Sequence, residues 1–229
     1  FATVGRKDER LFSTLAAAAE QRMRDFNSQE LANTAWAFAT VGRKDERLFS
    51  TLAAAAEQRM RDFNPQALAN TAWAFAVANF VSELLFGPAF AHCLEAIDFC
   101  ASELRQLHQW VLWHQELKLP PPLSPALQDR CKISFCGTSH WPSQSQRDVV
   151  RILTKLGVPV EEEEQVIQGG YSIKLVVIWK GERMGIEFDG PSQFFRGDGV
   201  RNGAKMLKRR QLCSLGWEIT TSRTGSVSN

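Results

Sequence analysis

The chain has 229 residues, 44% of them hydrophobic and 23% charged, and its 27 Lys and Arg nearly balance 25 Asp and Glu for a net charge of +2. This composition excludes a disordered chain, and any affinity for nucleic acid must come from a local concentration of charge. No apolar run approaches the ~20 residues of a membrane-spanning helix, and five cysteines without dense spacing exclude a secreted disulfide scaffold.

The N-terminal half is an internal repeat. Residues 1–37 and 38–74 are identical except that Ser28 becomes Pro65 and Glu30 becomes Ala67, and a degenerate third copy covers 75–118. Near-identity over 37 positions indicates a tandem duplication. Because the chain opens inside a copy and without an initiator methionine, we expect it to be a fragment of a longer protein.

Each copy predicts a pair of helices. In the second copy one helix covers residues 45–61, with an apolar stripe of Leu48, Leu52, Ala56 and Met60. The next helix begins at Asn64 and Pro65, or at a capping box of Asn27 and Glu30 in the first copy. One pair cannot bury its own stripe, so residues 1–118 predict an α-helical repeat, the end of an α-solenoid.

The pattern changes after residue 118. Residues 119–142 are rich in proline and predict a linker, in which Ser124 to Phe135 can hold a short helix. Residues 143–221 predict a small α/β domain in the order α-β-β-β-α-β, with a hairpin turn at Lys180, Gly181 and Glu182. Residues 222–229 predict a disordered tail.

Residues 143–221 resemble the RAP domain. The resemblance is carried by the segment Ile186 to Ser192, by Phe194, by Leu207 to Arg210 and by Leu215 to Trp217. RAP domains end many organellar RNA-handling proteins, including the FAST kinase-like mitochondrial proteins. The helical pairs, with their AWAFA segments, resemble the octotricopeptide and heptatricopeptide RNA-binding repeats that commonly precede them.

The resemblance implies a fold and a function. The α/β domain is expected to have a restriction-endonuclease-like core. The protein is expected to bind single-stranded RNA in a mitochondrion or chloroplast and to act in processing, stability or translation of organellar transcripts. Organellar ribonucleoproteins are further expected partners, and no membrane is involved.

A nuclease-like core raises the alternative of a divergent metal-dependent endoribonuclease. Glu187 and Asp189 lie two residues apart on a predicted strand, so both face one side of the sheet and are candidate Mg²⁺ ligands. Where many relatives carry an acid this chain has Lys174, and where they often carry histidine it has Gln193. Both departures count against catalysis, so Mg²⁺ is expected only if this alternative holds, and otherwise no cofactor.

Basic residues gather near the last predicted helix. The set carries a local charge of +5 after one acid, Asp198, is counted, and comprises Arg196, Arg201, Lys205, Lys208, Arg209 and Arg210. Contacts of this set with phosphates would give salt-dependent affinity of low sequence specificity. The alternative is a solvated helix face, paired with Glu161 to Glu164.

The repeats offer a second set of RNA-binding candidates, because stacked helical repeats can recognise one base per unit. Asn33 and Asn70 occupy equivalent positions on the second helix of each copy, accompanied by Gln29, Thr34, Gln66 and Thr71. The alternative is that these side chains brace the stack, and Trp36 and Trp73 are expected to pack in the core. A solenoid that binds a protein instead of RNA is a third functional alternative.

No metal site is expected. Cys131 and Cys136 are separated by four residues, with His140 downstream, and this spacing lacks a clear fourth ligand. The usual motifs of nucleotide-binding and serine-hydrolase sites are missing from the sequence.

Overall fold

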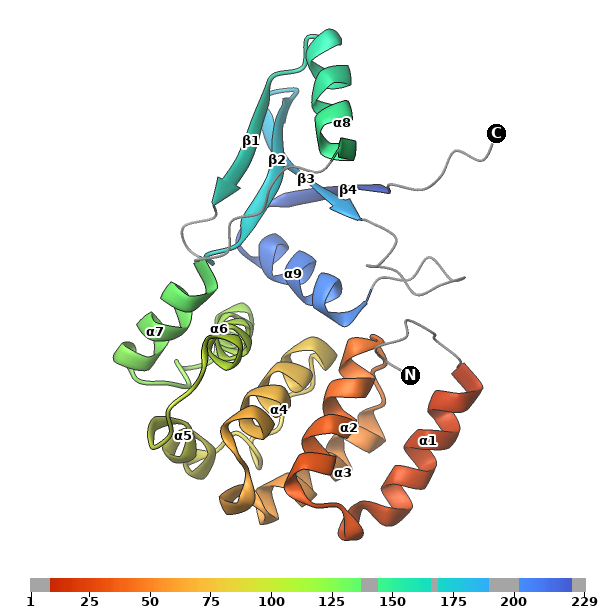
Figure 1. Cartoon of the computed structure of the whole chain (residues 1–229), viewed down its shortest axis with the longest axis vertical. Helices are drawn as coiled ribbons and strands as arrows, with labels where there is room; N and C mark the ends of the chain where they lie inside the picture. Colours follow the sequence, from red (N-terminus) through yellow and green to blue (C-terminus); the bar gives the residue numbers. More distant parts are fainter. Residues whose placement is uncertain (1–8, 137–143, 166–168, 190–201, 224–229) are drawn as a thin grey trace.

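The computed structural model describes residues 9–136, 144–165, 169–189 and 202–223 (Figure 1). This part of the chain is mostly helical and contains one small four-stranded sheet. Helices α1 to α7 form the lower part of the molecule in Figure 1, and the sheet lies above them with α8 and α9.

The two near-identical copies fold as helix pairs. They comprise α1 (Glu9–Arg22), α2 (Ser28–Thr40), α3 (Glu46–Gln58) and α4 (Pro65–Ala78), and a short 3-10 turn follows each first helix, Met23–Asp25 and Met60–Asp62. The predicted capping box is confirmed, because Asn27 Oδ1 accepts from Glu30 N at 2.9 Å and Asn27 N donates to Glu30 Oε2 at 2.8 Å. Asn64 caps α4, with Pro65 in its first turn, as predicted.

The degenerate copy also forms helices, α5 (Pro88–Glu95) and α6 (Ala101–Glu116). Helices α2, α4 and α6 lie side by side as an inner row (Figure 1). The central helix α4 is buried on almost every side, from Ala67 to Ala78 apart from Asn70. Its core contacts are largely aromatic, with the rings of Phe49 and Phe75 5.1 Å apart.

The sheet has the order β1-β2-β3-β4. Its strands are β1 (Val160–Gln165), β2 (Ser172–Trp179), β3 (Glu182–Asp189) and β4 (Glu218–Arg223). The first three are antiparallel, whereas β4 runs parallel to β3 after a crossover through α9 (Gly203–Ser214). The predicted hairpin is confirmed: Lys180 and Gly181 both have positive φ, 53° and 86°, as a two-residue turn requires.

One stretch differs from its prediction. β4 pairs as far as Arg223 opposite Asp189, so residues 222–223 belong to the sheet and not to the disordered tail; residues 224–229 lie outside the described part. Within residues 119–142, the short helix expected from Ser124 to Phe135 is found as α7 (Pro125–Cys136). This helix packs along α6 and carries the buried Leu127 and Cys131.

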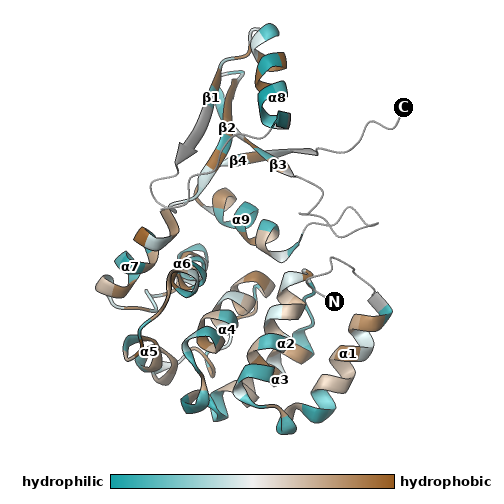
Figure 2. Cartoon of the chain, in the orientation of Figure 1, coloured by the Kyte–Doolittle hydropathy of each residue, from teal (hydrophilic) through white to brown (hydrophobic). Residues whose placement is uncertain are grey.

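The helical and α/β parts share a buried contact through α9. Leu207 of α9 belongs to the same apolar cluster as the repeat helices. At Gly203 an added Cβ would lie only 1.9 Å from the carbonyl oxygen of Ala39, so the start of α9 sits directly against the end of α2. By contrast, Ile152 of α8 (Gln144–Lys155), a helix with hydrophobic and hydrophilic turns (Figure 2), is exposed, and so is Leu156 directly after it.

Candidate nucleic-acid interface

A groove of about 600 Å³ crosses the inner row of helices. Its lining comes from α2, α4, α6 and α7 and is mostly polar and uncharged: Asn33, Trp36, Gln66, Asn70, Ser102, Glu103, Arg105, Gln106, Gln109 and Phe135. Among the described residues, one cation, Arg105, and one anion, Glu103, belong to this lining. Amides and aromatic rings in this arrangement can pair with and stack on flat polar groups.

The lining residues occupy equivalent positions in successive copies. Asn33 and Asn70 are 37 residues apart, and Asn70 and Gln106 are 36 apart because the third copy has lost one residue. Trp36, Trp73 and Gln109 form a second row with the same spacing. The groove is therefore a product of the repeat itself, and it includes both asparagines that the sequence singled out.

Of the other expected members of this set, Gln66 also lines the groove, whereas Gln29, Thr34 and Thr71 do not. Thr71 is buried, and the hydroxyl of Thr34 donates to the carbonyl of Glu30 one turn earlier, so both belong to the helices themselves. Trp73 is buried as predicted, and Trp36 is half-buried: it packs against the core and also lines the groove.

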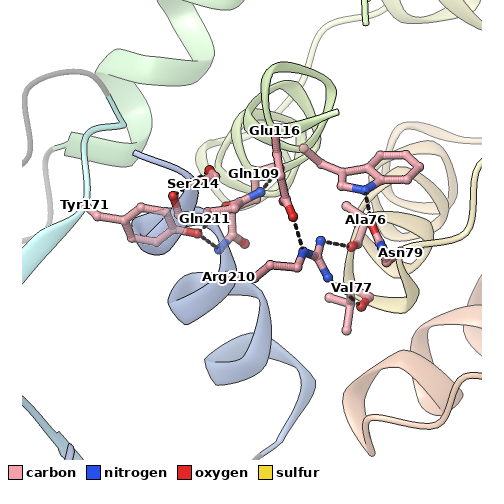
Figure 3. Close-up of polar contacts among 10 residues, drawn as sticks. Ala76, Val77, Asn79, Gln109, Glu116, Tyr171, Arg210, Gln211 and Ser214 are labelled. Atoms are coloured by element: carbon pink, nitrogen blue, oxygen red, sulfur yellow. Dashed lines mark hydrogen bonds and ion pairs between the residues drawn. The ribbon is translucent and has the colours of Figure 1, made fainter. Parts of the chain in front are cut away.

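At the end of the groove, hydrogen bonds link α6 to the α/β part (Figure 3). Gln109 Nε2 donates to the hydroxyl of Tyr171 at 2.8 Å, and that hydroxyl donates to Gln211 Oε1 at 2.6 Å. Gln211 Nε2 in turn donates to the carbonyl of Gln109 at 2.7 Å. Burial raises the pKa of Tyr171, so its hydroxyl stays protonated as this network needs.

His108 makes a parallel link. Its Nε2 lies 2.9 Å from the carbonyl oxygen of Gly169, so this nitrogen carries the proton. Burial lowers the pKa of His108 below its ordinary 6.5, and the ring is therefore neutral at pH 7.

The predicted basic set does not form one free face. Lys205 Nζ and Lys208 Nζ lie 3.3 Å and 2.8 Å from the two carboxylate oxygens of Glu187, which is buried. The expected acidic partner was the run Glu161 to Glu164, but Glu161 instead pairs with Arg183. Burial lowers the pKa of Lys208, and the carboxylate of Glu187 opposes that shift.

Arg210 faces the helical part instead of solvent (Figure 3). Its Nε lies 2.6 Å from Glu116 Oε1, and its other nitrogens donate to the carbonyls of Ala76 and Val77 in the last turn of α4. A cation suits the end of a helix, where carbonyls are unpaired. Arg209 is half-exposed and has no ion pair among the described residues. Arg196 and Arg201 lie outside the described residues.

The candidate catalytic pair is only partly described. Both oxygens of Glu187 contact lysines, and the space beside them is very small, about 10 Å³. The side chain of Asp189 lies outside the described part, as does His140. Within that part, no three His, Cys, Asp or Glu side chains gather as metal ligands. Cys131 is buried, which raises its pKa to about 12 and keeps it a thiol.

Several groove residues were missed at the sequence level. Gln106 and Gln109 become visible once one deletion is allowed in the third copy, since they then align with Asn70 and Trp73. Phe135 reaches the groove from α7, and its place depends on tertiary packing that no local pattern shows.

The molecule is thus a helical-repeat protein joined to a small α/β domain, and its repeats bear a polar groove. A family model described as RNA-editing substrate-binding complex 6 protein matches residues 1–116, and the chain belongs to this family. It is also similar to a chloroplastic RAP domain-containing protein of Oryza sativa subsp. japonica, at 27% identity over 128 residues. That match covers 52% of this chain and 19% of the rice protein, so the chain spans about a fifth of the relative's length.

These two matches confirm the resemblance to RAP-domain proteins of organellar RNA metabolism. Among the described helices, none combines the length and apolarity needed to cross a bilayer.

Proposed function

We propose that this chain binds single-stranded RNA in the groove formed by α2, α4 and α6. The observation that carries the proposal is the lining: neutral amides from equivalent positions of three successive copies, with two aromatic side chains. Such groups pair with base edges and stack on base faces, which only unpaired bases offer freely. The family match supports RNA as the ligand.

Most of the affinity is expected from bases and not from phosphates. In the described part of the chain, Arg105 is the one cation that lines the groove, and the lysines of α9 are already paired with Glu187. Each phosphate contact adds to the salt dependence of binding, so few contacts mean a shallow slope. This differs from the phosphate clamp that the basic set alone suggested. The proposed binding needs no metal ion.

The organellar role follows from the relatives. One family carries RNA editing in its description, and the rice relative is named as chloroplastic. We propose that this chain acts on mitochondrial or chloroplast transcripts within a ribonucleoprotein, in their processing, stability or translation. The stacked pairs would then be the end of an α-solenoid, and the α/β part a nuclease-like core that holds the last copy in place.

The test is a titration of the purified chain into fluorescently labelled 20-nucleotide RNA of random sequence, followed by anisotropy. Asn33→Glu and Gln66→Glu place negative charge in the groove and should each weaken binding about tenfold. Gln29→Glu is the matched control, because Gln29 is exposed on α2 but does not line the groove.

Unlabelled single-stranded RNA should compete, whereas a duplex of the same sequence should not. Equal binding by the wild type and both groove variants would overturn the groove as the site. No binding by a folded chain would overturn RNA as the ligand and favour a protein-binding solenoid.

A further inference from the structure

The inner row has two steps, one between α2 and α4, whose sequences are nearly the same, and one between α4 and α6 of the degenerate copy. The step between α2 and α4 and the step between α4 and α6 place equivalent side chains in one groove. A simple repeat code would give both steps the same ligand. Their hydrogen bonds show that the two steps are not equivalent.

The α4–α6 step is closed by its own side chains. Gln106 Nε2 donates to Asn70 Oδ1 at 2.9 Å, and Trp73 Nε1 donates to Gln109 Oε1 at 2.9 Å. The remaining amide nitrogen of Gln109 is taken by Tyr171. A base entering here would have to break these bonds, so this step holds the stack together and contributes little to recognition.

The α2–α4 step is open. Asn33 is exposed and Trp36 half-buried, and neither side chain hydrogen-bonds to another residue in the described ranges. The ring of Trp36 lies 6.4 Å from that of Trp73, tilted by 35°, so Trp73 supports it from within the core. An indole held in this way is a rigid stacking surface.

The hydrogen bond from Gln106 also affects which atoms of Asn70 can hydrogen-bond to a ligand. Oδ1 of Asn70 already accepts one hydrogen bond from Gln106, whereas Nδ2 makes no hydrogen bond with the described residues, and Nδ2 only donates. An acceptor on a ligand beside Asn70 would therefore meet a free donor. Asn33, on the neighbouring helix, can supply either a donor or an acceptor.

We propose that the α2–α4 step is a subsite for one nucleobase, stacked on Trp36, with a ring carbonyl oxygen accepting from Nδ2 of Asn70. Uracil and cytosine have such an oxygen, whereas adenine offers only ring nitrogens as acceptors. We therefore expect the subsite to prefer a base whose carbonyl oxygen projects from the ring toward Nδ2. This inference rests on the proposed function, because it places the RNA in the same groove.

The test compares labelled oligo(U), oligo(C) and oligo(A) of 15 nucleotides by anisotropy. The wild type should bind oligo(U) and oligo(C) at least about fivefold more tightly than oligo(A). Trp36→Leu should weaken binding of oligo(U) by about five- to a hundredfold, and Trp36→Phe should keep most of the affinity. Asn70→Asp, which removes the donors but keeps the shape, should abolish the preference over oligo(A).

Ser102→Ala is the matched control, since Ser102 lines the closed step at the position equivalent to Gln66. Its affinity should stay within about twofold of the wild type. Circular dichroism shows whether each variant folds. If Trp36→Leu does not fold, Trp36→Phe and Asn70→Asp still test the subsite.

The outcomes separate this inference from the proposed function. No binding of any RNA by the folded wild type defeats both. Binding that is unchanged by Trp36→Leu, or oligo(A) bound as tightly as oligo(U), overturns the subsite and leaves RNA binding intact.

Discussion

Glu187 is a buried carboxylate between two ammonium groups, with 6% of its side chain exposed. Its oxygens contact Lys205 and Lys208, and Lys208 also donates to the carbonyl of Ser172 at 2.8 Å. Removing one partner of such a cluster leaves buried charge uncompensated. At the scale of the residue, Glu187 therefore organises the contact between β3 and α9.

Glu187→Gln should lower the free energy of unfolding by about 3 kcal/mol, because two neighbouring cations lose their counter-charge. Urea denaturation followed by circular dichroism measures this. Groove affinity for RNA should stay near the wild-type value in the folded variant. Unchanged stability together with the loss of an RNA-cleaving activity would support the endoribonuclease alternative instead.

His108 makes the contact between α6 and Gly169 sensitive to acid. Its pKa is lowered in the folded state, so the unfolded chain binds the proton more readily. Stability is then full above pH 6.5, the ordinary value, and falls as the pH drops below it. In the wild type, urea midpoints should therefore decline between pH 7 and pH 5.5.

His108→Gln removes the titrating ring while keeping an amide that can donate to Gly169. The urea midpoint of His108→Gln should decline less between pH 7 and pH 5.5 than that of the wild type. Equal declines in the two proteins would show that another group causes the acid sensitivity.

At the scale of the element, α9 fixes the two parts of the molecule together. Gly203 begins the helix against the end of α2, and Arg210 binds the end of α4 and Glu116 of α6. One helix thus contacts all three inner helices at their C-terminal ends.

Gly203→Ala should lower the free energy of unfolding by about 2 kcal/mol or more, since the new Cβ meets a backbone carbonyl and the side chain of Val77. Thermal denaturation measures the loss. Gly181→Ala is a useful comparison: nothing lies within 4 Å there, and its cost comes only from the positive φ. A wild-type melting temperature for Gly203→Ala would contradict the close contact.

The local features of these elements were predictable from the sequence. Asn27 with Glu30, Asn64 with Pro65, and the hairpin turn at Lys180 depend on neighbours within a few residues, and each is found as expected. The extension of β4 to Arg223 was not, because pairing with β3 and not composition decides where that strand ends.

At the scale of the whole molecule, contacts between residues far apart in the chain determine which side chains are paired, buried or free, and the sequence did not show these contacts. Arg210 and Glu116 are 94 residues apart, so a charge count on α9 alone overstates its free positive charge. Trp36 and Trp73 lie in almost identical local sequences, yet only Trp73 is buried, because α6 covers it. The rows of polar residues were visible in the repeats, but their division into an open and a closed step was not.

The groove account also predicts a weak response to salt. Because Arg105 is the one cation among the lining residues that the structure describes, the affinity for single-stranded RNA should fall by less than about tenfold between 50 and 200 mM KCl. A titration series in KCl checks this. A fall of a hundredfold or more would mean that a basic surface outside the groove carries the binding.

The most direct test of RNA binding in the groove is photo-cross-linking of the wild-type chain to random single-stranded RNA that contains 4-thiouridine, with the adducts mapped by mass spectrometry. The account predicts adducts on the groove segments of α2, α4 and α6, around Trp36, Asn70 and Arg105. Adducts confined to α8, α9 or the sheet, with none in the groove, would contradict it.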